Sequence, residues 1–263
     1  MQQRFQYQDT TIHFILKGTG PRIILLHGFG ETATVWQDTL AALSNDYEIA
    51  VPDVPGSGQT NNVADMSMEG LARVVKALAE HLEWKEFVLI GHSMGGYIAL
   101  AFADLFPGIL RGLGLFHSTA YADAPEKIAT RRKGINFIRE HGAKAFLETT
   151  SPNLFAPHTR DERPELVDDF LSAAGSFSAD TLISYYESMI NRPDRSELLS
   201  RVSYPVLIVM GKFDQAIPMT DALRLCKLPK KAYIHTLTQS GHLGMLEEPQ
   251  SSYFLLREFL TGC

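Results

Sequence analysis

Short runs of consecutive apolar residues recur along the chain, and they do not alternate with polar residues. Six runs stand out: RIILLHG (22–28), YEIAVPD (47–53), EFVLIGH (86–92), LRGLGLFHS (110–118), YPVLIVMG (204–211) and AYIHTL (232–237). Runs of this kind are typical of strands that are buried on both faces, as in a parallel sheet. Between most of them lie segments with helical spacing, at 67–82, 95–106 and 220–228. The alternation predicts an α/β fold, a mostly parallel twisted sheet flanked by helices.

Two parts of the chain depart from this alternation. Residues 4–18 read as two antiparallel strands around Asp9-Thr10, which predicts a hairpin at the edge of the sheet. The segment after the fourth run contains helix-like stretches of mixed charge and no aliphatic run, and the strands resume only at Tyr204. The sequence therefore predicts a core interrupted by a helical cap, with the core at 1–117 and 201–263 and the cap at 118–200.

Composition narrows the class of protein. Of the 263 residues, 45% are hydrophobic and 21% are charged, and the net charge of −6 disfavours a partner with a phosphate backbone. No apolar run reaches the roughly 18 residues of a membrane span, and the first ten residues lack the apolar region of a secretory signal. Two cysteines are too few for a disulfide framework or a zinc site. We expect a cytoplasmic monomer or homodimer that acts on a small molecule, with no nucleic acid, membrane, cofactor or metal.

The stretch FVLIGHSMGGYIAL (87–100) joins a strand to a helix with almost no loop. Its serine lies in Gly91-x-Ser93-x-Gly95, a spacing that should occur by chance in about one chain in ten of this length. The position between strand and helix forces a sharp, strained turn at Ser93 and lifts its hydroxyl onto the start of the helix. The N–H of Met94 points the same way and could bind a negative oxygen. The alternative is a tight turn whose serine only caps the helix.

A serine hydroxyl near neutral pH needs a base, and the base needs an orienting acid. The chain has nine histidines, but only His242 follows the last predicted strand in a glycine-containing loop before a helix. His92 adjoins the serine and therefore points elsewhere, and His27 ends a strand, where we expect it to brace loops. His242 is thus the candidate base.

The acid should come from the end of a strand between the serine and the histidine. Asp214, in VLIVMGKFDQAIP, comes just after such a strand, although an aspartate there can also serve only to form a turn. Asp123 is the second candidate. The chain order of the predicted triad is Ser93, Asp214, His242.

A second oxyanion donor is expected after the first strand of the parallel series. In LLHGFGET, Phe29 stands between two glycines, and its backbone N–H could act together with that of Met94. Loss of one such donor typically lowers the rate by about 10²–10³.

Five motifs, in this order, resemble the α/β-hydrolase superfamily over essentially the whole chain: HGFG (27–30), DVPGSGQT (53–60), GHSMGG (91–96), GKFDQAIP (211–218) and GHLGMLEEP (241–249). The resemblance implies that Ser93 is the nucleophile, Asp214 the acid and His242 the base, with Phe29 and Met94 as oxyanion donors. The chain looks most like the small, capped branch that includes carboxylesterases, enol-lactonases, carbon–carbon bond hydrolases and cofactor-free perhydrolases. Haloalkane dehalogenases and epoxide hydrolases are disfavoured, because they carry aspartate where this chain has Ser93.

The predicted function is cleavage of a small carboxylic ester through an acyl-enzyme. A lactonase or a carbon–carbon bond hydrolase on the same triad is the alternative, and a receptor-like binding protein with little turnover is the alternative of another class. A dinucleotide site at Gly28-x-Gly30-x-x-Ala33 is disfavoured, because a hairpin precedes it and the triad would have no role. We expect Arg131-Arg132-Lys133 to form a solvated helix face, and short neutral acyl groups to be preferred over long or anionic ones.

Overall fold

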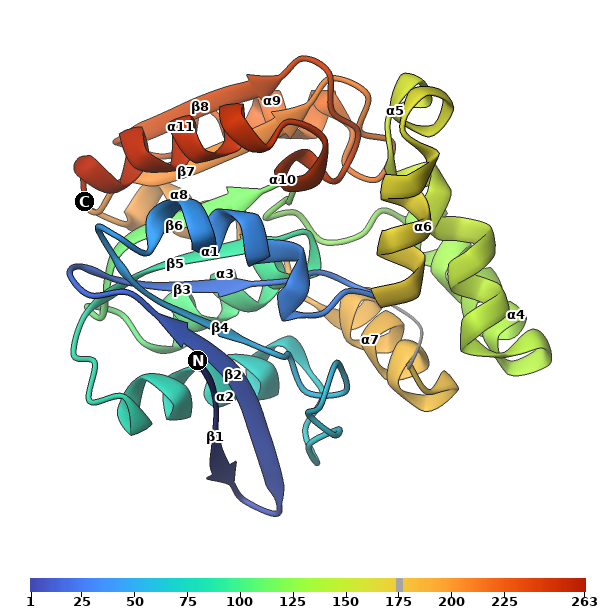
Figure 1. Ribbon diagram of the computed structural model, residues 1–263, viewed down its shortest axis with the longest axis horizontal. Helices are drawn as coiled ribbons and strands as arrows, with labels where there is room; N and C mark the ends of the chain where they lie inside the picture. Colours follow the sequence, from blue (N-terminus) through green and yellow to red (C-terminus); the bar gives the residue numbers. More distant parts are fainter. Residues whose placement is uncertain (174–176) are drawn as a thin grey trace.

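The computed structural model describes residues 1–173 and 177–263, and its centre is an eight-stranded sheet in the order β1-β2-β4-β3-β5-β6-β7-β8. Strands β3 to β8 run parallel to one another, while β1 and β2 form an antiparallel hairpin that joins β4 (Figure 1). The strands are β1 Gln2–Tyr7, β2 Thr10–Lys17, β3 Arg22–Leu26, β4 Glu48–Pro52, β5 Phe87–His92, β6 Leu110–Phe116, β7 Val206–Gly211 and β8 Ala232–Leu237. The predicted fold class is therefore confirmed. The hairpin turn lies one residue earlier than predicted, because Tyr7 pairs directly with Thr10.

Helices cover both faces of this sheet. They are η1 Ala33–Trp36, α1 Gln37–Leu43, α2 Met68–His81, α3 Met94–Leu105, α4 Pro125–Thr150, η2 Ser151–Leu154, α5 Pro157–Glu162, α6 Pro164–Ala173, α7 Ala179–Asn191, α8 Ser196–Arg201, α9 Met219–Leu225, α10 Gly244–Glu247 and α11 Pro249–Thr261. Ser67 caps α2, since its Oγ accepts the Gly70 N–H at 3.0 Å.

The consecutive apolar residues of the central strands are explained by this two-sided cover. In β3, Ile24 and Leu26 belong to the core cluster that contains α2 and α3. Their neighbours Ile23 and Leu25 belong to the cluster that contains α1 and α11. All four are at most 1% exposed. Because successive strand side chains point to opposite faces, only an unbroken apolar run can fill both clusters.

The chain between β6 and β7 contains the helices of the predicted cap. Helices α4 to α7 lie together beyond the carboxyl ends of the parallel strands (Figure 1). Tyr185 in α7 donates its hydroxyl to the Pro55 carbonyl at 2.6 Å, which joins this group to a core loop. Helix α8 packs elsewhere, since the adjacent Arg195 pairs with Asp104 of α3 at 3.3 Å. The segment predicted as the cap, 118–200, therefore includes most of α8, a helix that lies apart from α4 to α7.

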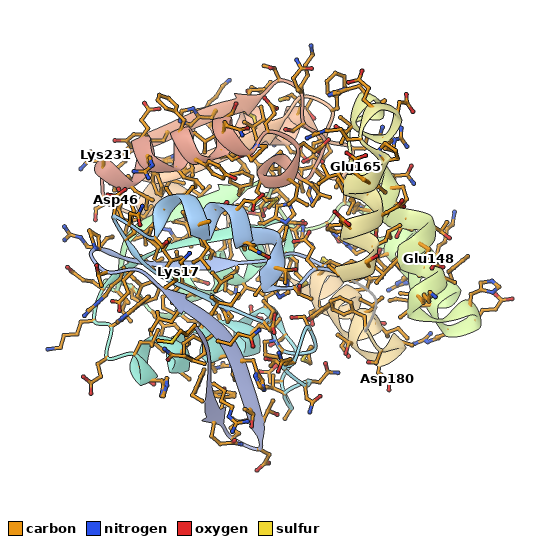
Figure 2. The ribbon with its side chains drawn as sticks, in the orientation of Figure 1. Lys17, Asp46, Glu148, Glu165, Asp180 and Lys231 are labelled. Carbon is orange, nitrogen blue, oxygen red and sulfur yellow. The ribbon has the colours of Figure 1, made fainter. Side chains whose placement is uncertain are left out.

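The outer surface carries charged side chains over both the sheet region and the helices beyond it. Figure 2 shows six of them, all exposed: Lys17, Asp46, Glu148, Glu165, Asp180 and Lys231. Among residues 1–173 and 177–263, none of the helices has the length and apolar character needed to cross a membrane.

Candidate active site

Ser93 occupies the predicted turn between a strand and a helix. Strand β5 ends at His92, helix α3 begins at Met94, and Ser93 between them has φ 51° and ψ −116°. A positive φ is strained for a residue with a Cβ atom, and such strain is typical of functional turns. The Ser93 side chain makes no capping hydrogen bond to α3. This argues against the interpretation that it serves only as a helix cap.

The glycines on either side of Ser93 are required by close packing. A Cβ atom on Gly91 would lie 2.2 Å from the backbone carbon of Gly95, and a Cβ on Gly95 would lie 2.7 Å from the His27 carbonyl oxygen. Both distances are shorter than any allowed contact. The Gly-x-Ser-x-Gly spacing is therefore what lets the turn pass so close to the neighbouring chain.

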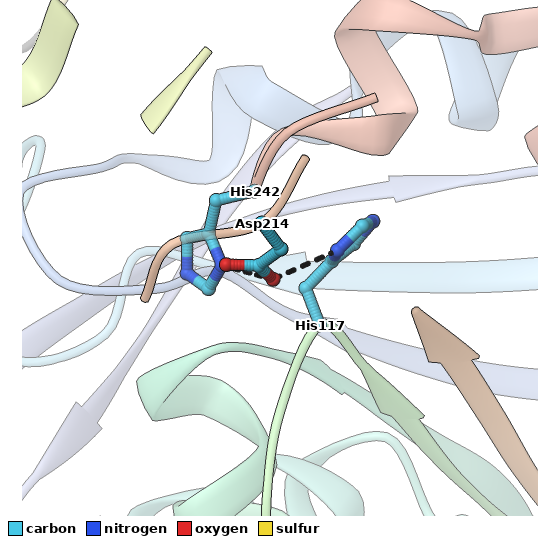
Figure 3. Close-up of side chains that lie close together, drawn as sticks. All are labelled: His117, Asp214 and His242. Carbon is cyan, nitrogen blue, oxygen red and sulfur yellow. Dashed lines mark hydrogen bonds and ion pairs between the residues drawn. The ribbon is translucent and has the colours of Figure 1, made fainter. Parts of the chain in front are cut away.

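Asp214 and His242 lie in contact, and they come from two loops at the carboxyl edge of the sheet (Figure 3). His242 Nδ1 lies 2.8 Å from Asp214 Oδ2, and both side chains are 3% exposed. The other oxygen of Asp214 accepts the backbone N–H groups of Ala216 at 2.8 Å and Ile217 at 3.0 Å. Burial alone would raise the pKa of Asp214, but the charge of His242 and the hydrogen bonds from His117 and His242 lower it below its usual value.

A second imidazole on the same carboxylate was not predicted. His117 Nδ1 lies 3.2 Å from Asp214 Oδ2, the oxygen that also faces His242 (Figure 3). Burial lowers the pKa of His117 from 6.5 to about 4, although Asp214 opposes the shift. The unfolded chain therefore binds this proton more tightly, so the stability that His117 contributes is lost as the pH falls from about 6.5 to about 4.

The cluster of His117, Asp214 and His242 also has the spacing of a candidate metal site. One ligand atom from each residue lies within 4.8 Å of the others. Both imidazoles, however, direct Nδ1 at one carboxylate oxygen at hydrogen-bond distance. We therefore interpret the cluster as a hydrogen-bonded network.

The predicted oxyanion donors, Phe29 and Met94, lie where a backbone N–H has no partner in a regular helix or strand. Met94 is the first residue of α3, where N–H groups have no partner within the helix. Within the described ranges, the Phe29 N–H makes no hydrogen bond. In the same ranges no hydrogen bond joins Ser93 Oγ to His242 Nε2, and the ring of His242 is bonded through Nδ1 to Asp214.

His27 braces loops, as the sequence suggested, and His92 bonds to groups other than Ser93. His92 Nδ1 lies 2.9 Å from the buried carboxylate of Glu31, and its Nε2 lies 2.8 Å from the His242 carbonyl oxygen. Glu31 also accepts the Gly28 N–H at 2.7 Å. This link, which sequence reasoning missed, ties the loop of Phe29 to the turn of Ser93 and to the loop of His242. His27 Nε2 accepts the Val54 N–H at 3.0 Å and so braces two loops.

Glu247 is a second buried carboxylate that was not predicted. One of its oxygens accepts the Ala156 N–H and the Thr159 hydroxyl, both at 2.7 Å, and the other accepts the Gly241 N–H at 2.8 Å. In addition, the His242 N–H donates to the Leu154 carbonyl at 2.6 Å. The loop of His242 is thus fixed to the chain between β6 and β7.

The prediction for Arg131 is wrong. Arg132 and Lys133 are exposed, but Arg131 is only 8% exposed. Its Nε lies 2.5 Å from Asp123, and Arg192 pairs with the same carboxylate at 2.9 Å. Arg131 therefore points inward because Asp123 neutralises it there. Its spacing with Ile135 and Ile138, both buried in the same helix, is the sequence signal that could have shown this.

We expect Asp123→Asn to destabilise the fold, because it leaves two buried guanidinium groups without a counter-charge. The loss should be about 3 kcal/mol, which corresponds to a melting temperature lower by roughly 10 °C. The control is Glu197→Gln, which removes an exposed pair with Arg201 at 3.6 Å and should change stability by less than about 0.5 kcal/mol. Equal melting temperatures for the two variants would contradict the structural role of Asp123.

Comparison with known proteins identifies the family. A family model described as alpha/beta hydrolase fold matches residues 21–249. The chain is 28% identical over 271 residues to pyrrolizixenacetamide deacetylase from Xenorhabdus hominickii. This match covers 97% of this chain and 96% of the relative. It is 24% identical over 247 residues to 3-oxoadipate enol-lactonase 2 from Acinetobacter baylyi, covering 93% and 91% of the two chains.

A solved structure agrees in its fold over the full length. A thermophilic esterase from Thermogutta terrifontis superposes with a TM-score of 0.92 at 28% identity, covering 99% of this chain and 98% of the other. The matched region includes the turn of Ser93 and the loops of Asp214 and His242. The chain therefore belongs to the α/β-hydrolase fold family.

Proposed function

We propose that this protein is a serine hydrolase that cleaves small carboxylic esters through an acyl-enzyme on Ser93. The observation that carries the proposal is the strained turn at Ser93, with φ 51°, at the start of a helix. A strained turn of this kind, between a strand and a helix, exposes the serine hydroxyl at the edge of the sheet. The buried Asp214–His242 pair, at 2.8 Å, supports the same assignment by supplying a base with an orienting acid.

In the proposed reaction, the Ser93 oxygen attacks the ester carbonyl carbon while its proton passes to His242 Nε2. Asp214 holds His242 with the proton on Nδ1 and stabilises the imidazolium that forms. The backbone N–H groups of Phe29 and Met94 bind the negative oxygen of the tetrahedral intermediate. The intermediate collapses, the carbon–oxygen bond to the alcohol breaks, and His242 returns the proton to the departing alcohol. Water then attacks the acyl carbonyl carbon and gives a proton to His242. The bond to the Ser93 oxygen breaks, His242 returns the proton to that oxygen, and the carboxylic acid leaves.

The relatives support an acyl substrate, since they are named as a deacetylase, an enol-lactonase and an esterase. The experiment that tests the proposal is steady-state hydrolysis of p-nitrophenyl acetate, with a lactone and a vinylogous diketone in parallel. Multiple turnovers on the ester are expected. A protein that binds these compounds and turns over none of them would instead be receptor-like.

We expect short neutral esters to be preferred, because the side chains packed around Phe29 are aromatic. The ring of Phe29 stacks on Tyr186 with centroids 4.5 Å apart and meets Phe146 edge-on at 6.2 Å. Arg131 lies 5.4 Å from the Tyr186 ring, but it is already paired with Asp123. Trp36 and Phe116, two further aromatic residues, are fully buried in the core.

The measurement is kcat/KM for a series of p-nitrophenyl esters together with the monoester of a dicarboxylic acid. Acyl groups of roughly two to six carbons should be hydrolysed fastest, by analogy with the superfamily. A higher kcat/KM for an anionic enol-lactone or a diketone acid would contradict this, and would favour the lactonase or carbon–carbon hydrolase alternative.

A further inference from the structure

We propose that His117 is a positioning residue for the base: its Nδ1–H holds the same Asp214 oxygen that orients His242, and so limits the negative charge that His242 experiences. The proposal rests on the proposed function, since it assigns a role within the same triad. His117 itself is only 1% exposed and acts through its contact with Asp214.

The geometry of Asp214 leads to this assignment. Its carboxylate accepts four hydrogen bonds, two on each oxygen. Oδ1 faces the backbone N–H groups of Ala216 and Ile217, and Oδ2 faces His117 at 3.2 Å and His242 at 2.8 Å. The two imidazoles therefore share one oxygen. The negative charge that the hydrogen bond from His117 neutralises is not available to stabilise a charge on His242.

The backbone at His117 is held in an unusual conformation that aims its ring at Asp214. His117 follows β6 with φ 49°, and its N–H donates to the Val209 carbonyl of β7 at 2.9 Å. The ring fills its space closely, since a Cβ atom on Gly244 would lie 2.5 Å from His117 Nε2. A positive φ in a residue other than glycine persists where the surroundings enforce it, and it clusters at functional sites.

The protonation state of His117 follows from its surroundings. The groups that face it are Asp214, His242 and His92, the last with ring centroids 6.1 Å apart. Its Nε2 is buried and has no hydrogen-bond partner within residues 1–173 and 177–263. A ring with its proton on Nδ1 donates that proton to Asp214. Its Nε2 then carries no proton, so no N–H donor is buried without an acceptor. Burial also holds the pKa of His117 at about 4, so the ring is neutral at neutral pH.

The consequence is a defined direction in the pH profile. With His117 in place, part of the charge of Asp214 is engaged, so less of that charge is available to stabilise the imidazolium form of His242. Removing the donor leaves the carboxylate free to stabilise the imidazolium of His242. The acid limb of kcat/KM against pH, where the base becomes protonated, should then move to higher pH.

The kinetic test compares two substitutions at His117. His117→Asn keeps a donor at the position of Nδ1 and tolerates a positive φ, whereas His117→Leu has nearly the same shape as Asn and no donor. We expect the acid limb to move up by about one pH unit in the Leu variant and to stay near the wild-type position in the Asn variant. A folded Leu variant with an unchanged limb would overturn the proposal.

A second measurement does not depend on turnover. In the Ser93→Ala protein, imidazole ¹⁵N NMR should show His117 neutral, with its proton on Nδ1, from neutral pH down to about pH 4. The same spectra should show the His242 ring titrating at higher pH once His117→Leu is added. A proton on Nε2 of His117 would overturn the proposal even if the Leu variant fails to fold. If the wild-type protein cleaves no ester while these spectra appear as expected, the proposed function fails and the hydrogen-bond role of His117 stands.

Discussion

Ser93→Ala should abolish ester turnover and leave the fold intact. The side chain makes no capping hydrogen bond to α3, so its removal takes away the nucleophile and little else. The expected loss in kcat is roughly four to six orders of magnitude, with the remainder supplied by binding and the oxyanion donors. The measurements are p-nitrophenyl acetate hydrolysis and the mass of the peptide labelled by a fluorophosphonate, which should contain Ser93 only in the unsubstituted protein.

The matched control is Ser67→Ala, which removes the same hydroxyl at another helix start. Ser67 does cap its helix, since its Oγ accepts the Gly70 N–H at 3.0 Å. Its loss should lower stability by about 1 kcal/mol without changing kcat. Comparison of the two variants distinguishes a serine that acts as a nucleophile from one that only caps a helix. Labelling that persists in Ser93→Ala would refute the nucleophile.

The sheet was predictable because its signal is local. In β3, each residue from Ile23 to Leu26 is buried against helices on one face or the other, and an unbroken apolar run is the direct sign of that. The turn at Ser93 was predictable for a similar reason. Only glycine can stand at positions 91 and 95 without a clash, so the packing is visible in five consecutive residues.

The supporting groups of the site were not predictable, since they depend on contacts between distant parts of the chain. His117 meets Asp214 across 97 positions, and Glu31 meets His92 across 61. Nothing near His117 in the sequence distinguishes it from the other histidines that end or follow strands. Its ring reaches Asp214 only because β6 and β7 are neighbours in the sheet.

Asp214→Asn should lower kcat by roughly four orders of magnitude while the protein stays folded. The structure determines which way the new amide points. Its carbonyl oxygen must take the place of Oδ1, because the N–H groups of Ala216 and Ile217 point there at 2.8 and 3.0 Å. Its NH₂ group then faces His242 and His117.

The NH₂ group in the Asn variant can only donate, so Nδ1 of His242 must accept and its proton moves to Nε2. A ring with its proton on Nε2 cannot take the proton of Ser93, and the first step fails although every side chain is in place. Steady-state kinetics on p-nitrophenyl acetate, with circular dichroism as the folding check, measures this effect. The control is Asp123→Asn, which should keep kcat within a few-fold at temperatures well below its lowered melting point. If Asp123→Asn abolishes turnover while folded and Asp214→Asn does not, the acid of the triad is Asp123.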